Sequence, residues 1–503
     1  AGITYQQNRS EGLNSGTFSG FLTDIYLDNN LAAASVKPSN TNSTYSDSKL
    51  LSYLGRINYA YDGKYLLTLT GRYDGSSKFS ENNKYAFFPS GAVAWRISKE
   101  SFMENARAVS NLKLRVSYGK SGNQAISPYQ TLGQLSTTSV TFNNTATTTY
   151  YSSRLENKSL RWETTSQFDI GLDLGLFNER LQLTADYYSK KTTDLLLDVT
   201  LPPNTGFGSV LQNVGETGNR GFEFLLNGAI LTGNGLNWNS TFNLTSNKTR
   251  LIDLGKDALG NPITYKEVGT GGNWFPMLIG NSMQQLYGYK VIGVYQSDAD
   301  AVANGEPTKK AGNYKFQDTD GNGVVDGNDR IVLTHFEPKF TFGFGNSFSY
   351  KNFGLSFLFV GSYGNDIANE FRKYNITLNG KWTPTQEAYD NRWQAGKGTN
   401  MFDKPSANSG NDIRDYANSL WVENGSYVRL RDITLSYNVP VSFTNRMKIA
   451  SLELYISAQN FITITKYSGY DPEAAWQSAT INGWDRGNYP ATKAVTGGVK
   501  INF

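Results

Sequence analysis

The 503-residue chain contains no cysteine and a single histidine, His335. Without cysteine there can be no disulfide, no thiolate metal site and no cysteine nucleophile. One histidine cannot supply a histidine-based zinc cluster, and any Ser-His-Asp triad would have to include His335. Because no nucleophile-elbow spacing lies near it, we interpret His335 as an ordinary loop or strand residue. We therefore predict that the chain is not an enzyme.

Long apolar runs and clusters of like charge are also missing. No segment approaches the roughly 20 apolar residues that a membrane-spanning helix requires. The 47 basic and 43 acidic residues give a net charge of +4, without runs of Lys or Arg, so a nucleic acid is not predicted as a partner. Amphipathic strands are not excluded, because only every second residue of such a strand must face lipid.

Several segments instead alternate apolar and polar residues with a period of two. Leu112, Leu114 and Val116, for example, alternate with Lys113 and Arg115. The same period runs through residues 168–174, 181–187, 340–344 and 452–458. These segments are predicted β-strands with one polar face. The period slips by one residue near Asp432, which predicts a β-bulge or a strand end there.

The connections between these strands alternate between short and long. Short turns are predicted at residues 62–64, 177–180, 232–235, 351–354 and 440–448, with an intermediate connection at 98–111. Long polar segments lie near residues 8–48, 74–84, 120–166, 191–218, 247–338, 363–426 and 460–494. This alternation predicts an all-β fold. The chain would form about 14 strands of a transmembrane, antiparallel, up-and-down β-barrel. Its short turns would be periplasmic and its long loops extracellular.

A soluble β-sandwich or propeller has similar strands, because half-buried strands look alike in both solvents. The positions of the aromatic residues favour the membrane. Tyr59, Tyr61 and Tyr65 flank one turn, and Tyr350 and Phe353 bracket another. Aromatic belts of this kind mark the two interfaces of a membrane barrel. We therefore predict contact with the lipid of a bacterial outer membrane.

The chain ends on Val499, Ile501 and Phe503, which alternate with polar residues. A strand with one apolar face and a final aromatic residue resembles the last strand of bacterial outer-membrane barrels. In such barrels this strand is the signal that the barrel-assembly machinery reads. The resemblance implies the same role for these three residues.

Longer motifs identify a family. Arg72-Tyr73-Asp74-Gly75-Ser76-Ser77-Lys78-Phe79 and LKLRVSYGKSGN at residues 112–123 resemble the C-terminal barrel half of SusC/RagA-type TonB-dependent transporters of Bacteroidetes. Further matches lie at residues 50–56, 65–68, 88–90, 162–165, 213–215, 219–223, 430–437 and 489–490. They follow the family's order from about residue 50 to Phe503.

The resemblance implies a barrel of about 22 strands filled by a plug. Residues 1–503 would form its C-terminal part, and the signal peptide, TonB box, plug and first strands have no counterpart in this sequence. Such transporters import large nutrients, oligosaccharides or peptides, with energy from the TonB-ExbB-ExbD complex and with a SusD-like surface lipoprotein as a lid. Two alternatives remain open: a surface-exposed or secreted binding module for glycans or peptides, and a secreted carbohydrate-active enzyme.

One segment carries a metal-binding motif of its own. Residues 318–329 match an EF-hand-like calcium loop, in which oxygen ligands recur at fixed positions around a glycine. The predicted ligands are Asp318, Asp320, Asn322, Val324, Asp326 and Asp329. Asp329 replaces the usual glutamate with a shorter side chain. Because Asp-Gly and Asn-Gly also form tight turns, a plain hairpin is the alternative. We favour a structural Ca²⁺ ion in an extracellular loop.

Other candidate residues in the long segments are weaker. Six tryptophans lie in or beside these segments and could stack on a sugar or peptide, although packing or an interface belt is the favoured interpretation. They are Trp274, Trp382, Trp393, Trp421, Trp476 and Trp484. Two carboxylate pairs, Asp24/Asp28 and Asp412/Asp415, are interpreted as solvated loop charge rather than as a glycosidase pair.

Overall fold

The computed structural model describes most of the chain. The described residues are 1–14, 19, 42–142, 144–233, 235–257, 259–267, 274–376, 378, 382–398, 401–405, 417–473, 476–477 and 481–503. All structural statements below refer to them.

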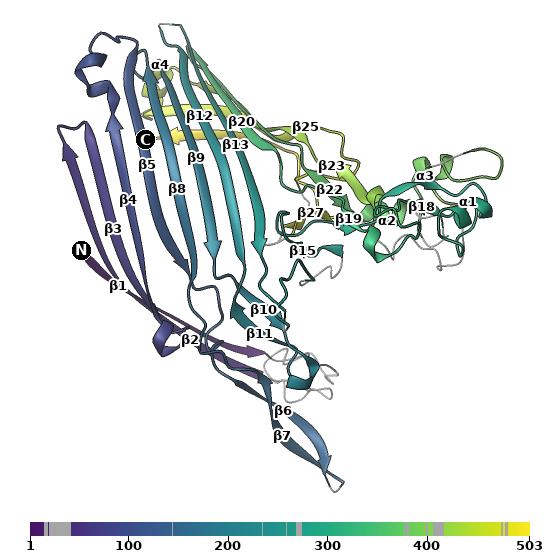
Figure 1. Cartoon of the computed structure of the whole chain (residues 1–503). Coiled ribbons are helices and arrows are strands. Elements are labelled where there is room, and N and C mark those ends of the chain that lie inside the picture. The colour runs from purple at the N-terminus through teal and green to yellow at the C-terminus, as the bar shows by residue number, and fades with distance from the viewer. Residues whose placement is uncertain are drawn as a thin grey trace.

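Fourteen described strands form one antiparallel sheet in which neighbours in the sheet follow one another along the chain (Figure 1). They are β1 (Gly2–Asn14), β2 (Asn42–Tyr61), β3 (Tyr65–Ser76), β4 (Tyr85–Arg96), β5 (Val109–Asn123), β8 (Glu163–Leu176), β9 (Leu181–Thr193), β12 (Glu216–Leu231), β13 (Leu236–Asp253), β20 (Phe340–Tyr350), β21 (Phe353–Tyr363), β24 (Tyr427–Asn438), β25 (Ser451–Thr465) and β28 (Ala494–Asn502). The up-and-down order and the predicted number of strands are confirmed.

The short connections are tight because their residues adopt left-handed backbone conformations. Between β2 and β3, Asp62 and Gly63 have φ angles of 51° and 61°. This conformation suits a tight hairpin turn, since it matches the twist of the paired strands. The turn closes with a hydrogen bond of 3.0 Å from the Lys64 amide to the Tyr61 carbonyl. The turns therefore set the register of the hairpins.

The predicted break in alternation at Asp432 is a β-bulge. The pairing of β24 with β25 shifts between Leu430 and Asp432, and the pairing of β24 with β21 shifts between Leu358 and Phe359. The extra residue restores the apolar alternation on one face, as the pattern indicated.

The predicted boundaries of the first long segment are wrong. Residues 8–48 were expected to be a loop, but β1 continues to Asn14 and β2 begins at Asn42. β1 pairs with β2 over its full length, from Gly2 opposite Leu54 to Asn14 opposite Asn42. Polar residues such as Gln6, Asn8 and Ser10 read as loop residues, yet backbone pairing carries the hairpin beyond its apolar part.

The long connections contain secondary structure of their own. Two of them form hairpins, β6 (Gln134–Phe142) with β7 (Thr145–Arg154) and β10 (Leu196–Thr200) with β11 (Ser209–Asn213). The described parts of residues 254–339, 364–426 and 466–493 form a separate structure, which we call the loop lobe (Figure 1). Among the described residues, no helix has the length and apolar character needed to cross a membrane.

The loop lobe is built from short elements. Its paired strands are β14 (Tyr265–Lys266) with β15 (Met277–Leu278), β16 (Tyr287–Gly288) with β19 (Ile331–Val332), β17 (Val291–Val294) with β18 (Tyr314–Phe316), and a sheet of β23 (Val422–Asn424), β22 (Asp366–Asn369), β27 (Asn482–Asp485) and β26 (Trp476–Gln477). Its helices are α1 (Asp298–Ala303), α2 (Glu370–Asn375) and α3 (Gln386–Asp390); α4 (Val441–Thr444) lies outside it, between β24 and β25.

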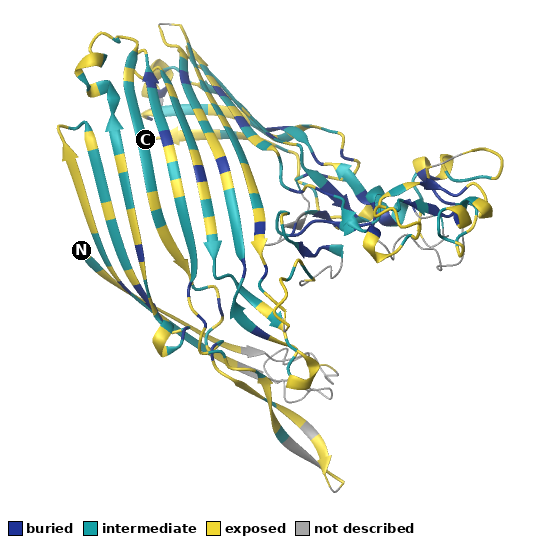
Figure 2. Cartoon of the chain, in the orientation of Figure 1, coloured by how far each residue is buried: buried dark blue, intermediate teal, exposed yellow. Residues whose placement is uncertain are grey.

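Buried residues gather in the loop lobe rather than in the sheet (Figure 2). The largest buried cluster joins all three long segments, with Phe275 and Leu286 from the first, Ala368 and Trp421 from the second, and Trp484 from the third. Apolar burial of this kind is what stabilises a folded unit in water. The long segments are therefore a packed structure and not independent loops.

Candidate functional site

The two faces of the fourteen-stranded sheet differ in chemistry. We call the face that carries Val116, Ile170 and Phe222 the apolar face, and the opposite one the polar face. Val116 pairs with Ile170, and Ile170 with Tyr187, so these side chains share one face across adjacent strands. Many large side chains of this face are exposed, for example Ile57 at 64% and Val93 at 53%. An apolar surface of this extent is typical of the lipid-facing side of a membrane barrel.

Ion pairs line the polar face. Arg115 on β5 lies 2.9 Å from Asp173 on β8 and 2.8 Å from Asp186 on β9, and Lys113 lies 2.7 Å from Asp173. The network therefore crosses three neighbouring strands. Charged side chains on this face are compatible with the polar interior of a transport barrel.

A buried ionic cluster, which the sequence did not reveal, attaches the last long segment to the sheet. Arg429 on β24 is 2% exposed, forms an ion pair with Asp471 and lies 2.7 Å from Glu473. Glu473 also pairs with Arg431. Burial opposes ionisation, but the Arg429 guanidinium nevertheless holds the pKa of Asp471 below its usual value. The only sequence signal is the pair of arginines two residues apart.

A polar cavity of about 840 Å³ lies where the ends of β13, β20 and β21 meet the loop lobe. Its lining includes Asn247, Gln285, His335, Glu337, Lys339 and Asp366. His335 is an exposed lining residue whose Nδ1 lies 3.7 Å from Asp366. The cavity offers both charges and several amides, which suits a polar ligand rather than an apolar one.

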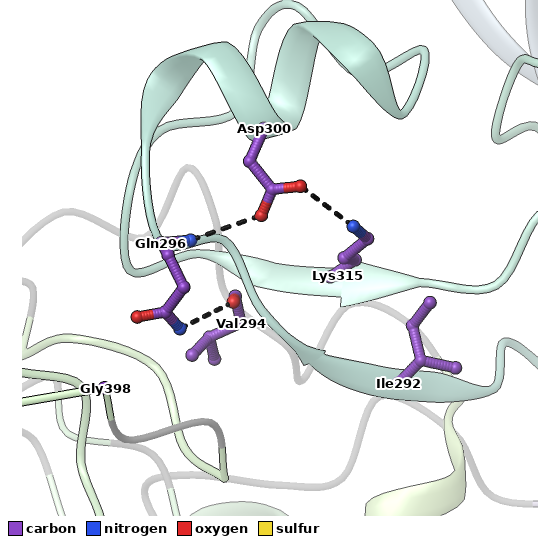
Figure 3. A pocket seen from close by; sticks show the side chains of 6 residues that line it. All are labelled: Ile292, Val294, Gln296, Asp300, Lys315 and Gly398. Carbon is purple, nitrogen blue, oxygen red and sulfur yellow. Dashed lines mark hydrogen bonds and ion pairs between the residues drawn. The ribbon is translucent and has the colours of Figure 1, made fainter.

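A second pocket of about 400 Å³ lies in the loop lobe beside α1 and the β17/β18 hairpin (Figure 3). Asp300 on α1 and Lys315 on β18 face each other with a 2.9 Å contact. The Gln296 backbone amide also donates to Asp300, over 3.3 Å. Ile292 and Val294 supply the apolar part of the lining. Asp300 and Lys315 therefore neutralise each other within the pocket.

The structure brings together part of the predicted metal site. One carboxylate oxygen from each of Asp318, Asp320 and Asp329 lies within 4.8 Å of the others. Asp326 is outside this group, and its carboxylate accepts a hydrogen bond of 2.7 Å from the Asn328 amide. The Asn322 side-chain oxygen accepts from the Val324 amide at 2.8 Å. Three carboxylates around one point are a donor set that fits a hard cation such as Ca²⁺.

Local hydrogen bonds hold these carboxylates in place. The two oxygens of Asp318 accept from the amides of Gly321 and Gly323 at 2.7 and 2.8 Å. Both glycines have positive φ angles, 75° and 84°, which permit the sharp turn. Although burial opposes ionisation, backbone amides, including those of Asp326 and Thr319, hold the pKa of Asp329 below its usual value. The surroundings thus favour the charged form of the Asp329 carboxylate.

The tryptophans mostly pack in the loop lobe. Trp421 and Trp484 are buried, and Trp274 packs against the same cluster. Trp393 packs against a neighbouring cluster. These four residues therefore pack in the lobe, in line with the interpretation favoured from the sequence. Trp382 is 48% exposed and contacts Tyr374 in a tilted arrangement, with ring centres 4.9 Å apart.

Three further sets of predicted residues are placed as follows. Trp476 lies in the short strand β26. The carboxylate pairs Asp24/Asp28 and Asp412/Asp415 lie outside the described residues. Val499 and Ile501 lie on β28 and are exposed, and Phe503 follows that strand with 94% of its surface exposed. The assembly signal formed by these last three residues stays a prediction.

An antiparallel meander with one apolar, exposed face and one charged face defines the wall of a transmembrane β-barrel. Comparisons with known proteins agree. Residues 1–328 match the family model "TonB dependent receptor-like, beta-barrel". The chain belongs to this family, whose β-barrels lie in the bacterial outer membrane.

Curated relatives support the same assignment. The chain is 38% identical to TonB-dependent receptor P26 of Formosa agariphila, over all of this chain and 51% of that protein. It is 30% identical to TonB-dependent receptor SusC of Bacteroides thetaiotaomicron, over 90% of this chain and 44% of that protein. The chain spans about half the length of the curated relatives it matches. Both relatives are TonB-dependent receptors.

Among solved structures, the RagAB peptide importer in its closed-closed state has the same fold. The TM-score is 0.83 at 24% sequence identity, over all of this chain and 53% of the matched chain. The predicted resemblance to SusC and RagA is confirmed.

Proposed function

We propose that residues 1–503 are the C-terminal part of the barrel of a TonB-dependent importer for a large nutrient, an oligosaccharide or a peptide. A SusD-like surface lipoprotein would cover the loop lobe, and the TonB-ExbB-ExbD complex would supply the energy. The remaining strands and the plug would belong to the part of the relatives' length that this chain does not match. The barrel-assembly machinery would insert the protein.

The observation that carries this proposal is the loop lobe above a lipid-compatible wall. The lobe is large, folded and polar at its cavity, and its core joins three long connections at one end of the strands. A packed lobe presents a fixed surface to a lid or a nutrient, which separate mobile loops would not. The exposed apolar face disfavours a soluble binding module, because it would promote aggregation in water.

The direct test is uptake by cells that lack the full-length protein. Wild-type, deletion and complemented strains would receive fluorescent pools of oligosaccharides or of peptides, with and without a protonophore. Accumulation should occur for one pool, require the gene and stop with the protonophore, because TonB needs the proton gradient. Binding at the surface should persist with the protonophore. Uptake that continues in the deletion strain would contradict the proposal.

Crosslinking in intact cells tests the lipoprotein. A photoreactive amino acid at the exposed Trp382 of the loop lobe should crosslink to a surface lipoprotein. The same probe at Phe102, which is exposed in the connection between β4 and β5 at the opposite end of the strands, is the matched control. Equal crosslinking from both positions would contradict a lid above the lobe.

We also propose that Asp318, Asp320 and Asp329 bind Ca²⁺ and stiffen their loop. The ion would act structurally, by offsetting repulsion between the three carboxylates. In the full-length protein, Ca²⁺ should slow proteolysis between residues 318 and 329, and EGTA should reverse this. Asp320→Asn should raise the Ca²⁺ concentration needed for half-maximal protection at least tenfold, whereas Asp298→Asn on α1 should leave it unchanged. Equal proteolysis of the wild type with Ca²⁺ and EGTA would exclude this role.

A further inference from the structure

A group of cations lies on the apolar face where the strands approach the long connections. We call Lys120 on β5, Lys191 on β9, Arg220 on β12, and Lys248 and Arg250 on β13 the basic band. All five residues are exposed, and Lys248 also lines the edge of the polar cavity next to the loop lobe. Their position on the face that meets lipid is unusual, because that face is otherwise apolar or aromatic over the membrane-embedded length of these strands.

The strand register places these cations in two adjacent rows. In the first row, Lys120 pairs with Ser166, and Ser166 pairs with Lys191. Gly218 pairs with Lys191 on one side and with Arg250 on the other, so Arg250 lies in the same row. In the next row toward the short turns, Arg220 pairs directly with Lys248. Directly opposed residues of antiparallel strands share one face. Because neighbouring strands are about 4.8 Å apart, the five strands from β5 to β13 span about 20 Å.

Aromatic residues on the same face locate the basic band relative to the membrane. Tyr118 pairs with Phe168, and one row further toward the short turns Tyr187 pairs with Phe222. These four side chains are 41–50% exposed. Exposed aromatic residues on the lipid face mark the interface of a membrane barrel. The cations therefore lie at or just beyond that interface, at the level of lipid head groups.

The charges of the basic band are largely unneutralised by the protein. Two described carboxylates lie on the same face of these strands: Glu216, which pairs with Lys191 at 2.8 Å, and Asp253, which is opposite Glu216 and accepts a hydrogen bond from the Gly255 amide. No ion pair joins a described carboxylate to any of the other four cations. Acidic residues of these strands, such as Asp169, Asp186 and Glu223, lie on the polar face instead. The separation of charge between the faces indicates an external anion.

We propose that the basic band binds the phosphate groups of a lipid head group in the leaflet next to the long connections. This proposal rests on the proposed function, in which the barrel lies in the outer membrane. Arg220 and Arg250 can each hold a phosphate through two parallel hydrogen bonds, and the lysines add point charges. The acyl chains of the same lipid would lie along the aromatic and aliphatic rows below. A free phosphate ion would gain no contact from those rows.

The experiment is native mass spectrometry of the full-length protein in detergent, titrated with bisphosphorylated lipid A and with the same lipid after removal of its phosphates. The wild type should bind the phosphorylated form at least tenfold more tightly. The triple variant Arg220→Gln, Lys248→Gln, Arg250→Gln should lose that preference. Lys190→Gln is the matched control, because Lys190 neighbours Lys191 on β9 but lies on the polar face, over the ring of Tyr188. It should bind like the wild type.

Three further outcomes bear on the proposal. Inorganic phosphate at millimolar concentration should not displace the lipid; if it does, the site takes free phosphate and the lipid assignment is wrong. Equal affinity for both lipid forms, or equal loss in Lys190→Gln, would overturn the site. If the triple variant fails to assemble, the salt dependence of wild-type binding decides, since phosphate contacts weaken as salt rises. Nutrient uptake is measured separately, so failure here leaves the importer proposal untouched.

Discussion

At the scale of single residues, the loop lobe contains a carboxyl group whose surroundings favour the protonated form. Asp403 is buried, and burial raises its pKa to about 7. Tyr314, also buried, has a pKa well above its usual value for the same reason. One oxygen of Asp403 and the Tyr314 hydroxyl have no hydrogen-bond partner among the described residues. Burial of such groups opposes the charged form.

The Asp403 carboxyl group predicts a pH dependence of the lobe. Its pKa is about 3.9 in an unfolded chain, so the folded lobe binds the proton more tightly and gains stability at low pH. That gain should be lost as pH rises from about 4 to 7, by at most about 1.4 kcal/mol per pH unit. Asp403→Asn should flatten the dependence, measured by hydrogen exchange across the lobe. Asp390→Asn, exposed on α3, should leave the slope unchanged; an unchanged slope in Asp403→Asn would contradict the assignment.

A second prediction concerns Arg429. Its removal leaves Asp471 as a buried, uncompensated charge, which typically destabilises by about 3–5 kcal/mol. Arg429→Leu should therefore open residues 466–493 to protease while the sheet stays assembled. Arg486→Leu is the control, because its ion pair with Glu370 is partly exposed and worth about 1 kcal/mol or less. Equal protease sensitivity in both variants would show that the Arg429 cluster does not anchor this segment.

At the scale of elements, strand identity follows from alternation, and this predicts how lysine substitutions act. Phe344 on β20 belongs to the apolar face, whereas Ser347 on the same strand faces the polar side. Phe344→Lys should destabilise the barrel by about 2–4 kcal/mol, as a lysine facing the bilayer does. Ser347→Lys should have little effect. Denaturant unfolding of the full-length protein in lipid measures both; similar destabilisation would mean that the faces are misassigned.

Strands and short turns could be predicted from sequence because their signals are local. The period of two and residues such as Asp62-Gly63 act within a few positions, and the bulge at Asp432 follows from the same pattern. The Asp318 loop was likewise visible as one contiguous motif. In contrast, the Arg429 cluster joins residues 42 positions apart, and the basic band exists only through the register of several strands. Neither arrangement leaves a local pattern.

The strand ends and the loop lobe were predicted less well for a related reason. The β1/β2 hairpin extends into polar sequence, because backbone hydrogen bonds do not depend on side-chain polarity. The long segments were expected to be loops, yet their apolar residues pack with partners from distant segments. Burial of this kind is decided by tertiary contacts, which single-segment patterns do not contain.

At the scale of the whole molecule, the fourteen-stranded sheet has two edges among the described residues, β1 and β28. In lipid, unpaired backbone groups at an edge cost several kcal/mol each. We therefore expect residues 1–503 expressed alone to aggregate, and the full-length protein to assemble into a heat-modifiable barrel. Electrophoresis of unboiled and boiled membrane fractions compares the two. Heat-modifiable assembly of residues 1–503 alone would show that these edges can pair with each other.

The loop lobe also sets an order of events during biogenesis. Its core takes residues from three segments that are separated in sequence by complete strand hairpins. Pairing of β13, β20, β21, β24 and β25 brings those segments together, so we expect the lobe to fold after these strands have found their register. Until then Phe275, Trp421 and Trp484 are exposed on unfinished chain in transit. We therefore expect the yield of this protein at the cell surface to fall when periplasmic chaperones are depleted, because exposed apolar side chains promote aggregation.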